Sequence, residues 1–356
     1  MSGSPPRALR VGARTVQIGL GTIWLFDGLL QLQPKMFGPA FADQVIRPAA
    51  GGQPGVVAWP VEEMARLVSV HPAASNVVFA AVQLLIGIGL LRRETVRPAL
   101  AVSFAWSAGV WCFGEGLGML FTGTASPLSG APGAALLYAL VGVAVWPRRR
   151  PAGDPDRHVS AAAAGLLGDR GARALWAALW TGMAALWLLP ANHAPDAVSR
   201  ALAGAAGSSP VWLAHLQSWL AGVLRGDGVG VSIVLGALSI AIGTGPLVVR
   251  RPTPFLVAGV ALSLDFWLLG QSLGGIVTGI ATDPNAGPLF VLFALALFPS
   301  GPDTAPAERA RRGTVHPWPS TAVPSPALTS PSRTSAWGPG PGATAPPGAW
   351  GAMTPT

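Results

Sequence analysis

The chain has 356 residues, of which 51% are hydrophobic and only 11% are charged. Soluble domains carry about a quarter charged residues, so the composition excludes an ordinary soluble domain and indicates a polytopic membrane protein. The net charge of +8 comes from short basic clusters between apolar runs, which argues against a nucleic-acid-binding face. The single cysteine, Cys112, excludes an intramolecular disulfide and any multi-cysteine metal centre.

Eight apolar segments approach the ~20 residues that a helix needs to cross a bilayer. Helices satisfy their own backbone hydrogen bonds in lipid, so we expect an all-α integral membrane protein. Arginines precede the first segment, but no small-residue cleavage site follows it, which predicts a retained span rather than a signal peptide. The predicted spans are 12–33, 74–91, 98–121, 131–147, 173–190, 229–249, 254–276 and 286–300.

The distribution of basic residues predicts the orientation. With the N-terminus inside, the inner segments hold 18 Lys and Arg residues and the outer segments hold 5. This bias predicts a multi-pass plasma-membrane protein whose N- and C-termini are both cytoplasmic. The two long outer connections, 34–73 and 191–228, each contain a predicted amphipathic helix that lies along the outer surface or over the bundle.

The composition changes after Ser300. The last 56 residues contain 12 prolines and cannot bury enough apolar surface to offset their ordering entropy, which predicts a disordered cytoplasmic tail. The expected organisation is a first four-helix unit (1–147), a cytoplasmic linker (148–172), a second four-helix unit (173–300) and the tail (301–356).

The two units are predicted to be copies of one another. "WCFGEGLGMLFTGTAS" (111–126) aligns without gaps on "WLLGQSLGGIVTGIAT" (267–282), at an offset of 156 residues. The same offset carries Gly87 onto Gly243 and Pro98 onto Pro254. Because each unit has an even number of spans, both copies insert in the same direction, as two parallel four-helix repeats.

Glycines recur four residues apart within the duplicated motif. Small residues at this spacing lie on one face of a helix and permit close helix approach. We therefore expect helix packing at four positions, Gly114, Gly118, Gly270 and Gly274.

One polar residue from each span of the first unit is predicted to lie at a similar depth. Glu115 lies seven residues before Thr122, which at ~1.5 Å per residue is about 10 Å below the outer surface. A carboxylate facing lipid is costly, so both acids should face the bundle interior. The expected set for a ligand or proton pocket is Asp27, Gln83, Glu115 and Tyr138, with His71 as a further candidate at the start of the second span.

The second copy lacks this polar set. Glu115 aligns with Gln271, Tyr138 with Phe293 and Gln83 with Ser239, while Asp27 aligns with Leu188 at a shifted offset of 161. The first unit is thus predicted to carry the site and the second to scaffold it, although Asp265 in the second unit has a glycine as its counterpart. A protonated acid that only fastens helices together is the alternative interpretation. No ligand cluster for a metal is found in the sequence.

The motifs "GLGTIWLFDGLLQLQPKMF" and "GEGLG…TGTAS…GAPGAALLYAL" resemble those of DoxX-like membrane proteins, the DoxX/DoxD-related four-helix modules. The resemblance covers about 12–147, extends faintly over 173–300 and departs from the usual single module because this chain is doubled. It implies a membrane subunit of a redox or electron-transfer assembly, with a quinone as the possible ligand and a redox protein as the possible partner. The residues alone leave open a small-solute or proton-coupled transporter, a purely structural subunit, and whether the chain is an enzyme.

Overall fold

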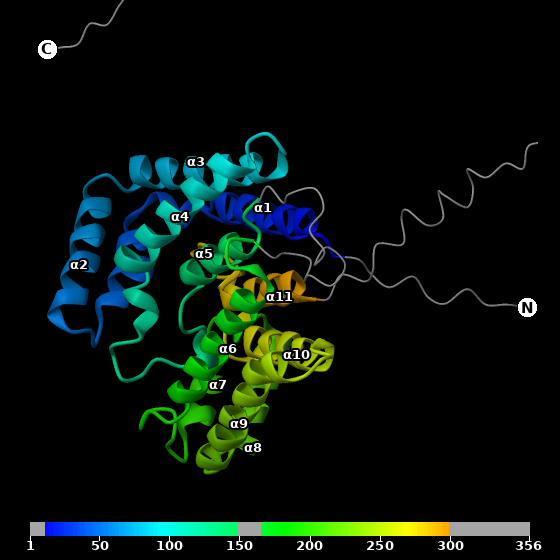
Figure 1. Ribbon diagram of the computed structural model, residues 1–356. Helices are drawn as coiled ribbons and strands as arrows, with labels where there is room; N and C mark the ends of the chain where they lie inside the picture. Colours follow the sequence, from blue (N-terminus) through cyan, green and yellow to red (C-terminus); the bar gives the residue numbers. More distant parts are fainter. Residues whose placement is uncertain (1–10, 148–164, 299–356) are drawn as a thin grey trace, which may run out of the picture. The chain divides into compact units, whose positions relative to one another are not determined.

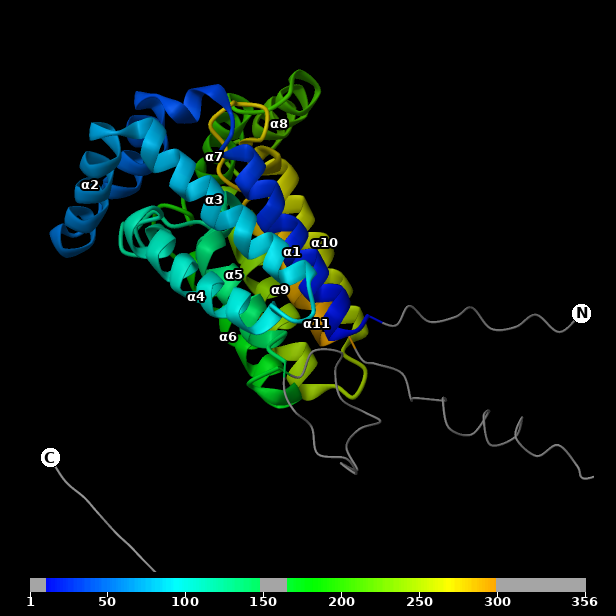
Figure 2. The same ribbon diagram turned by 90° about the horizontal axis from the view of Figure 1, so that it is seen from above.

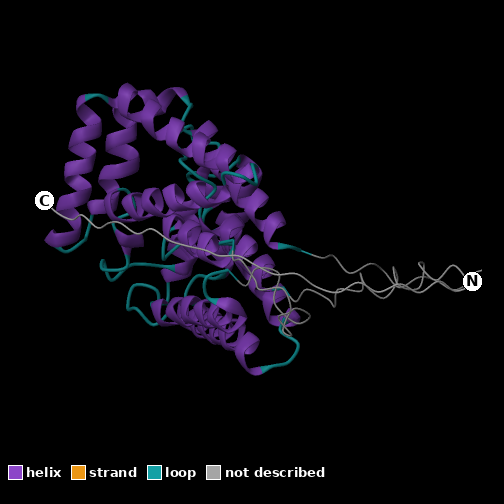
Figure 3. Ribbon diagram, turned by 45° about the horizontal axis from the view of Figure 1, so that its top comes forward, coloured by secondary structure: helices purple, strands orange, loops and turns teal. Residues whose placement is uncertain are grey.

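The computed structural model describes residues 11–147 and 165–298. The predicted tail (301–356) and most of the predicted linker (148–172) lie outside the described residues. Within them, the chain consists of helices joined by loops, as Figure 3 shows. The all-α prediction is confirmed for this part of the chain.

Four helices of the first half correspond to predicted spans, and one belongs to the outer connection (Figure 1). Short helical turns lie between them: η1 (Pro34–Phe37), η2 (Phe41–Ile46), η3 (Arg47–Ala50), η4 (Leu117–Met119) and η5 (Pro127–Ser129). The five helices are α1 (Ala13–Leu30), α2 (Gly55–Val70), α3 (Pro72–Leu91), α4 (Val96–Phe113) and α5 (Ala134–Ala144).

The second half has the same order of elements with a different outer connection. Its helices are α6 (Gly168–Leu186), α7 (Ala197–Ala206), α8 (Val211–Val223), α9 (Gly228–Val248), α10 (Thr253–Leu269) and α11 (Ala286–Leu297), with the turn η7 (Ser272–Gly275) before α11. Helices α3, α4 and α9 are long and apolar enough to cross a membrane, and α5, α10 and α11 are shorter apolar helices. These apolar helices suggest contact with a lipid bilayer.

The two halves use the same helix contacts. Helix α1 packs along α3 as α6 packs along α9, and α4 packs on α5 as α10 packs on α11. Helix α11 also contacts α5 and α1, so one hydrophobic core runs through both halves. The hydrogen bonds repeat as well: Trp111 Nε1 donates to the Pro132 carbonyl oxygen at 2.9 Å, and Trp267 Nε1 donates to that of Pro284 at 2.6 Å.

Arginines cap helix ends at the side where α1 begins. Arg14 donates to the carbonyl oxygens of Leu90 and Leu91 at the end of α3. Arg173 donates to the carbonyl oxygen of Pro246 near the end of α9 at 3.0 Å. Cations at helix C-termini complement the helix dipole and satisfy the last carbonyl groups. An arginine of the first helix of each half thus caps the helix packed beside it.

The outer connections lie at the other end of the bundle, where α2, α7 and α8 are seen in Figure 2. The predicted amphipathic helices are present as α2 and α8. Their apolar residues, however, fall on two faces: Val61 and Leu213 are fully buried, whereas Trp59, Trp212 and Trp219 are about 60% exposed.

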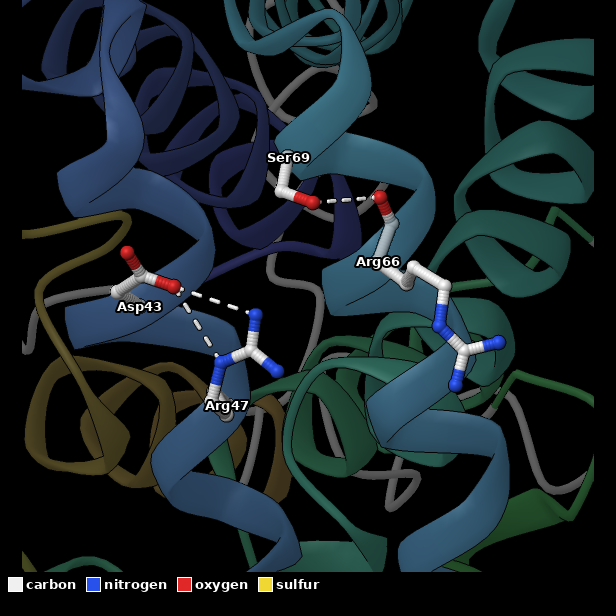
Figure 4. Close-up of polar contacts among 4 residues, drawn as sticks. All are labelled: Asp43, Arg47, Arg66 and Ser69. Atoms are coloured by element: carbon white, nitrogen blue, oxygen red, sulfur yellow. Dashed lines mark hydrogen bonds and ion pairs between the residues drawn. The ribbon is translucent and has the colours of Figure 1, made fainter.

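A second hydrophobic cluster holds α2 against η2, and it includes Phe41 and Val61. Polar contacts on this segment are local (Figure 4): Arg47 pairs with Asp43 at 3.2 Å, and Ser69 Oγ donates to the Arg66 carbonyl oxygen at 2.7 Å. Exposed pairs of this kind contribute little to stability, so the hydrophobic cluster holds the segment in place.

Gly87 lies at a close approach of α1 and α3. A methyl group placed there would lie 2.9 Å from the Gly21 carbonyl oxygen and 2.7 Å from Leu25 Cγ. We expect Gly87→Ala to lower the free energy of unfolding by about 1–3 kcal/mol because the two helices must move apart. Denaturant unfolding in mixed micelles measures this. Gly182→Ala on α6, where the new methyl meets open space, is the control and is expected to be neutral or slightly stabilising.

Candidate functional site

A cavity of about 300 Å³ lies in the first half, lined by all four of its bundle helices. The outer connection contributes Phe41, Val45, Ile46 and Met64, and the loop before α11 contributes Thr282 and Asp283. Most of the lining is apolar, with a small number of polar groups, which is the usual composition of a small-molecule site. Four of the five sequence-predicted pocket residues line it: Asp27, Gln83, Glu115 and Tyr138.

Asp27 and Tyr138 meet across α1 and α5. The Tyr138 hydroxyl donates to Asp27 Oδ2 at 2.5 Å, and both side chains are buried. The Tyr138 ring packs on Trp24, one turn earlier on α1, with ring centroids 4.3 Å apart. Asp27 Oδ1 is also buried and has no hydrogen-bond partner among the described residues. One oxygen of the carboxyl group is therefore held and the other remains available at the cavity.

Glu115 lies just after the end of α4, not within a span. The prediction of a span over 98–121 was wrong at its outer end, because α4 ends at Phe113 and the chain turns through residues with positive φ. The turn brings Glu115 to the start of α5, where Oε1 accepts a hydrogen bond from the Ala135 amide at 3.0 Å. Oε2 is buried and has no partner among the described residues.

Two glutamine side chains add further unpaired acceptors. Gln83 on α3 and Gln31 just after α1 both line the cavity and are at least 94% buried. Their Oε1 atoms have no hydrogen-bond partner among the described residues. An unpaired buried acceptor costs free energy, so these four atoms around one cavity are available to water or to a ligand that donates hydrogen bonds.

His71 does not belong to this group. It lies between α2 and α3, is exposed and is not among the cavity-lining residues.

Asp283 is a third carboxyl group at the cavity, and sequence reasoning missed it. Its Oδ1 accepts from the Asn285 amide and its Oδ2 from the Thr282 hydroxyl, both at 2.7 Å. Burial raises the pKa of Asp283 above its ordinary value, although these two hydrogen bonds lower it. The residue directly follows the duplicated motif, but nothing in the sequence indicates that the second half reaches into the pocket of the first.

The glycine prediction needs a correction. Gly114 and Gly270 follow the last residues of α4 and α10, while Gly118 and Gly274 lie in turns with φ near +64° and +72°. They therefore do not share a helix face. Close approach does occur, but to loops: Gly118 packs against the Pro132 carbonyl group, Gly274 against Pro284 and Gly270 against Leu128.

The structure also corrects two equivalences between the copies. Trp24 and Trp180 occupy equivalent positions at the offset of 156, so Met183, not Leu188, is the counterpart of Asp27. Tyr138 packs on Trp24 as Phe290 packs on Trp180, at a ring-centroid distance of 5.5 Å. Phe290 therefore replaces Phe293 as the counterpart of Tyr138, and the alignment failed here because the loops before α5 and α11 differ in length.

Gln271 is the structural counterpart of Glu115. Its Oε1 accepts from the Gly287 amide at 3.3 Å, at the start of α11, as Glu115 does at the start of α5. In the second half, bulky apolar side chains stand at positions equivalent to cavity-lining residues: at the offset of 156, Met183, Trp187 and Phe266 replace Asp27, Gln31 and Val110. All three are buried, and the Trp187 and Phe266 ring centroids lie 5.9 Å apart. Asp265, the acid that departs from the pattern, is exposed on α10 and does not line the cavity.

The three cavity acids do not converge on one point. Among the described residues, no group of three or more His, Cys, Asp and Glu side chains is placed to hold a metal ion. The fold and the site thus define a helical protein with bilayer-compatible helices and an acid-lined cavity. Comparison with known protein families, curated proteins and solved structures finds no match to this chain.

Proposed function

We propose that the chain is a polytopic plasma-membrane protein with eight spans, arranged as two parallel four-helix repeats. The spans are α1, α3, α4, α5, α6, α9, α10 and α11. The repeated contacts of α1 with α3 and α6 with α9 support the repeat, and the exposed tryptophans of α2 and α8 suit an outer membrane–water interface. In this arrangement both termini are cytoplasmic and the cavity lies near the outer leaflet.

The cavity is the ligand-binding site of this protein in our proposal. The observation that carries it is the set of buried, unpaired oxygen atoms around about 300 Å³ of space. A purely structural role would favour pairing these atoms, since a fastening acid stabilises helices only through the hydrogen bonds it makes. The resemblance to DoxX-like proteins supports a membrane subunit of a redox assembly, with a quinone or quinol as the ligand.

A second candidate is a proton-coupled transporter for a small solute. None of the described residues that line the cavity is Lys, Arg or His, so its carboxyl groups have no fixed basic partner there. Intramembrane acids of this kind are typical of proton and solute pathways. Asp27 and Glu115 are the coupling groups in this candidate.

Native mass spectrometry of the detergent-purified full-length protein tests the site. We expect wild type to retain a small molecule that the Asp27→Asn/Glu115→Gln double variant loses, and the molecule's mass distinguishes a quinone from a polar solute. Asp265→Asn, which changes an acid outside the cavity, is the control and should retain it. An equally loaded double variant, or a wild-type protein that carries nothing, would contradict the proposal.

A further inference from the structure

The charge of the cavity lining is one-sided. Asp27 and Glu115 come from the first half and Asp283 from the second, and no basic side chain stands among the described lining residues. A ligand carrying negative charge would be repelled by any of the three acids that is ionised, whereas a cation would be attracted. The acidic side chains of the lining therefore favour a positively charged ligand.

The unpaired polar atoms select in the same direction. Asp27 Oδ1 and Glu115 Oε2 can only accept hydrogen bonds when the carboxyl groups are ionised, and the Oε1 atoms of Gln31 and Gln83 are further acceptors. The Nε2 groups of the same glutamines, Trp106 Nε1 and Ser107 Oγ are able to donate. A ligand that donates several hydrogen bonds satisfies the carboxylate and amide oxygens, which have no partner among the described residues.

Aromatic rings form much of the remaining wall. Phe79 contacts Phe41 and Trp106 edge to face, with ring centroids 5.5 and 5.2 Å away, and Trp24 lies beside Tyr138. Aromatic faces attract cations, and they also pack on apolar groups. Such walls suit a ligand with a charged end and an apolar body.

We infer that the cavity binds a small organic cation, a primary ammonium group attached to an apolar or aromatic body. The ammonium supplies three donors to the carboxylate and amide oxygens, and the body fills the aromatic part of the cavity. A bare metal ion fits less well because the three acids do not converge on one point among the described residues. This inference rests on the proposed ligand-binding role of the cavity and, within that role, favours a cationic small solute over a quinone as the ligand.

Isothermal titration calorimetry on the detergent-solubilised full-length protein at pH 7 tests the inference with three probes of similar shape. These are 2-phenylethylammonium, 2-phenylethanol and phenylacetate, which differ mainly in the charge of the polar end. We expect the ammonium to bind at least ten-fold more tightly than the alcohol and the anion not to bind measurably. Asp27→Asn and Glu115→Gln should each weaken ammonium binding at least ten-fold and alcohol binding much less, which a misfolded variant would not do, and Asp265→Asn outside the cavity should bind both probes as wild type does.

Two other outcomes overturn the inference in different ways. If the alcohol or hydroquinone binds as tightly as the ammonium, the cavity is a ligand site but is not selective for cations, and the proposed function survives alone. If none of the probes, hydroquinone included, binds to wild type, and native mass spectrometry finds no retained molecule, both the inference and the proposed function fail.

Discussion

Replacing Glu115 with alanine is expected to lower the free energy of unfolding by about 2 kcal/mol, whereas replacement with glutamine is expected to change it little. Glu115 Oε1 accepts the hydrogen bond of the Ala135 amide in the first turn of α5, where no intrahelical partner exists. Alanine leaves this amide without its acceptor and opens a space next to the cavity. Glutamine keeps an acceptor oxygen of the same reach. Denaturant unfolding in mixed micelles measures both changes.

The second half of the chain contains the control for this experiment. Gln271 makes the equivalent bond to the Gly287 amide, so Gln271→Ala should be destabilising for the same reason while leaving the cavity intact. If Glu115→Gln destabilises the protein as much as Glu115→Ala, the negative charge itself supports the fold. Glu115→Gln would then not separate the structural hydrogen bond of Glu115 from the contribution of its charge.

Gly118→Ala is expected to be the most disruptive single change at this end of the bundle, costing about 3 kcal/mol or more. Gly118 has a φ of +64°, and a methyl group there would overlap the backbone carbonyl group of Pro132. Backbone atoms cannot move aside as a flexible side chain can, so the loop that carries Glu115 must separate from the start of α5. Proteolysis of the detergent-purified variant should show earlier cleavage in this segment.

Gly123→Ala distinguishes the clash from the backbone conformation. Gly123 has a similar φ of +73°, but a methyl group there would meet nothing within 4 Å. It should cost only the ~1–2 kcal/mol of a left-handed residue. Equal effects of the two substitutions would show that the contact with Pro132 is unimportant.

Much of the fold follows from the regular part of the sequence. Apolar length predicts helices near each expected span, and the duplicated motif predicts the paired hydrogen bonds of Trp111 and Trp267. Counting depth along helices groups Asp27 with Tyr138 because helix rise is constant and polar groups avoid lipid. The structure places both on one cavity, although their role as a functional site stays a prediction.

The parts that sequence reasoning missed are those that depend on loops. Glu115 was expected inside a helix, yet α4 ends two residues before it, because glycines in the motif permit a turn that hydropathy does not reveal. Asp283 reaches the cavity from far along the chain, and it lies just beyond the duplicated motif, where the loops before α5 and α11 differ in length. The counterpart of Asp27 was misassigned because an offset of 161 was used for the first span, whereas the offset of 156 that relates the second and third spans also relates Trp24 to Trp180.

The contribution of Asp283 and Thr282 has a consequence for stoichiometry. Part of the cavity wall belongs to the second half, while the positions of that half equivalent to Asp27, Gln31 and Val110 are occupied by the buried side chains of Met183, Trp187 and Phe266. In our proposal the ligand cavity lies in the first half and is completed by the second, so each polypeptide should saturate with a single ligand. A module that exists alone would need a neighbouring molecule to supply the missing wall, and in this chain covalent fusion guarantees that neighbour.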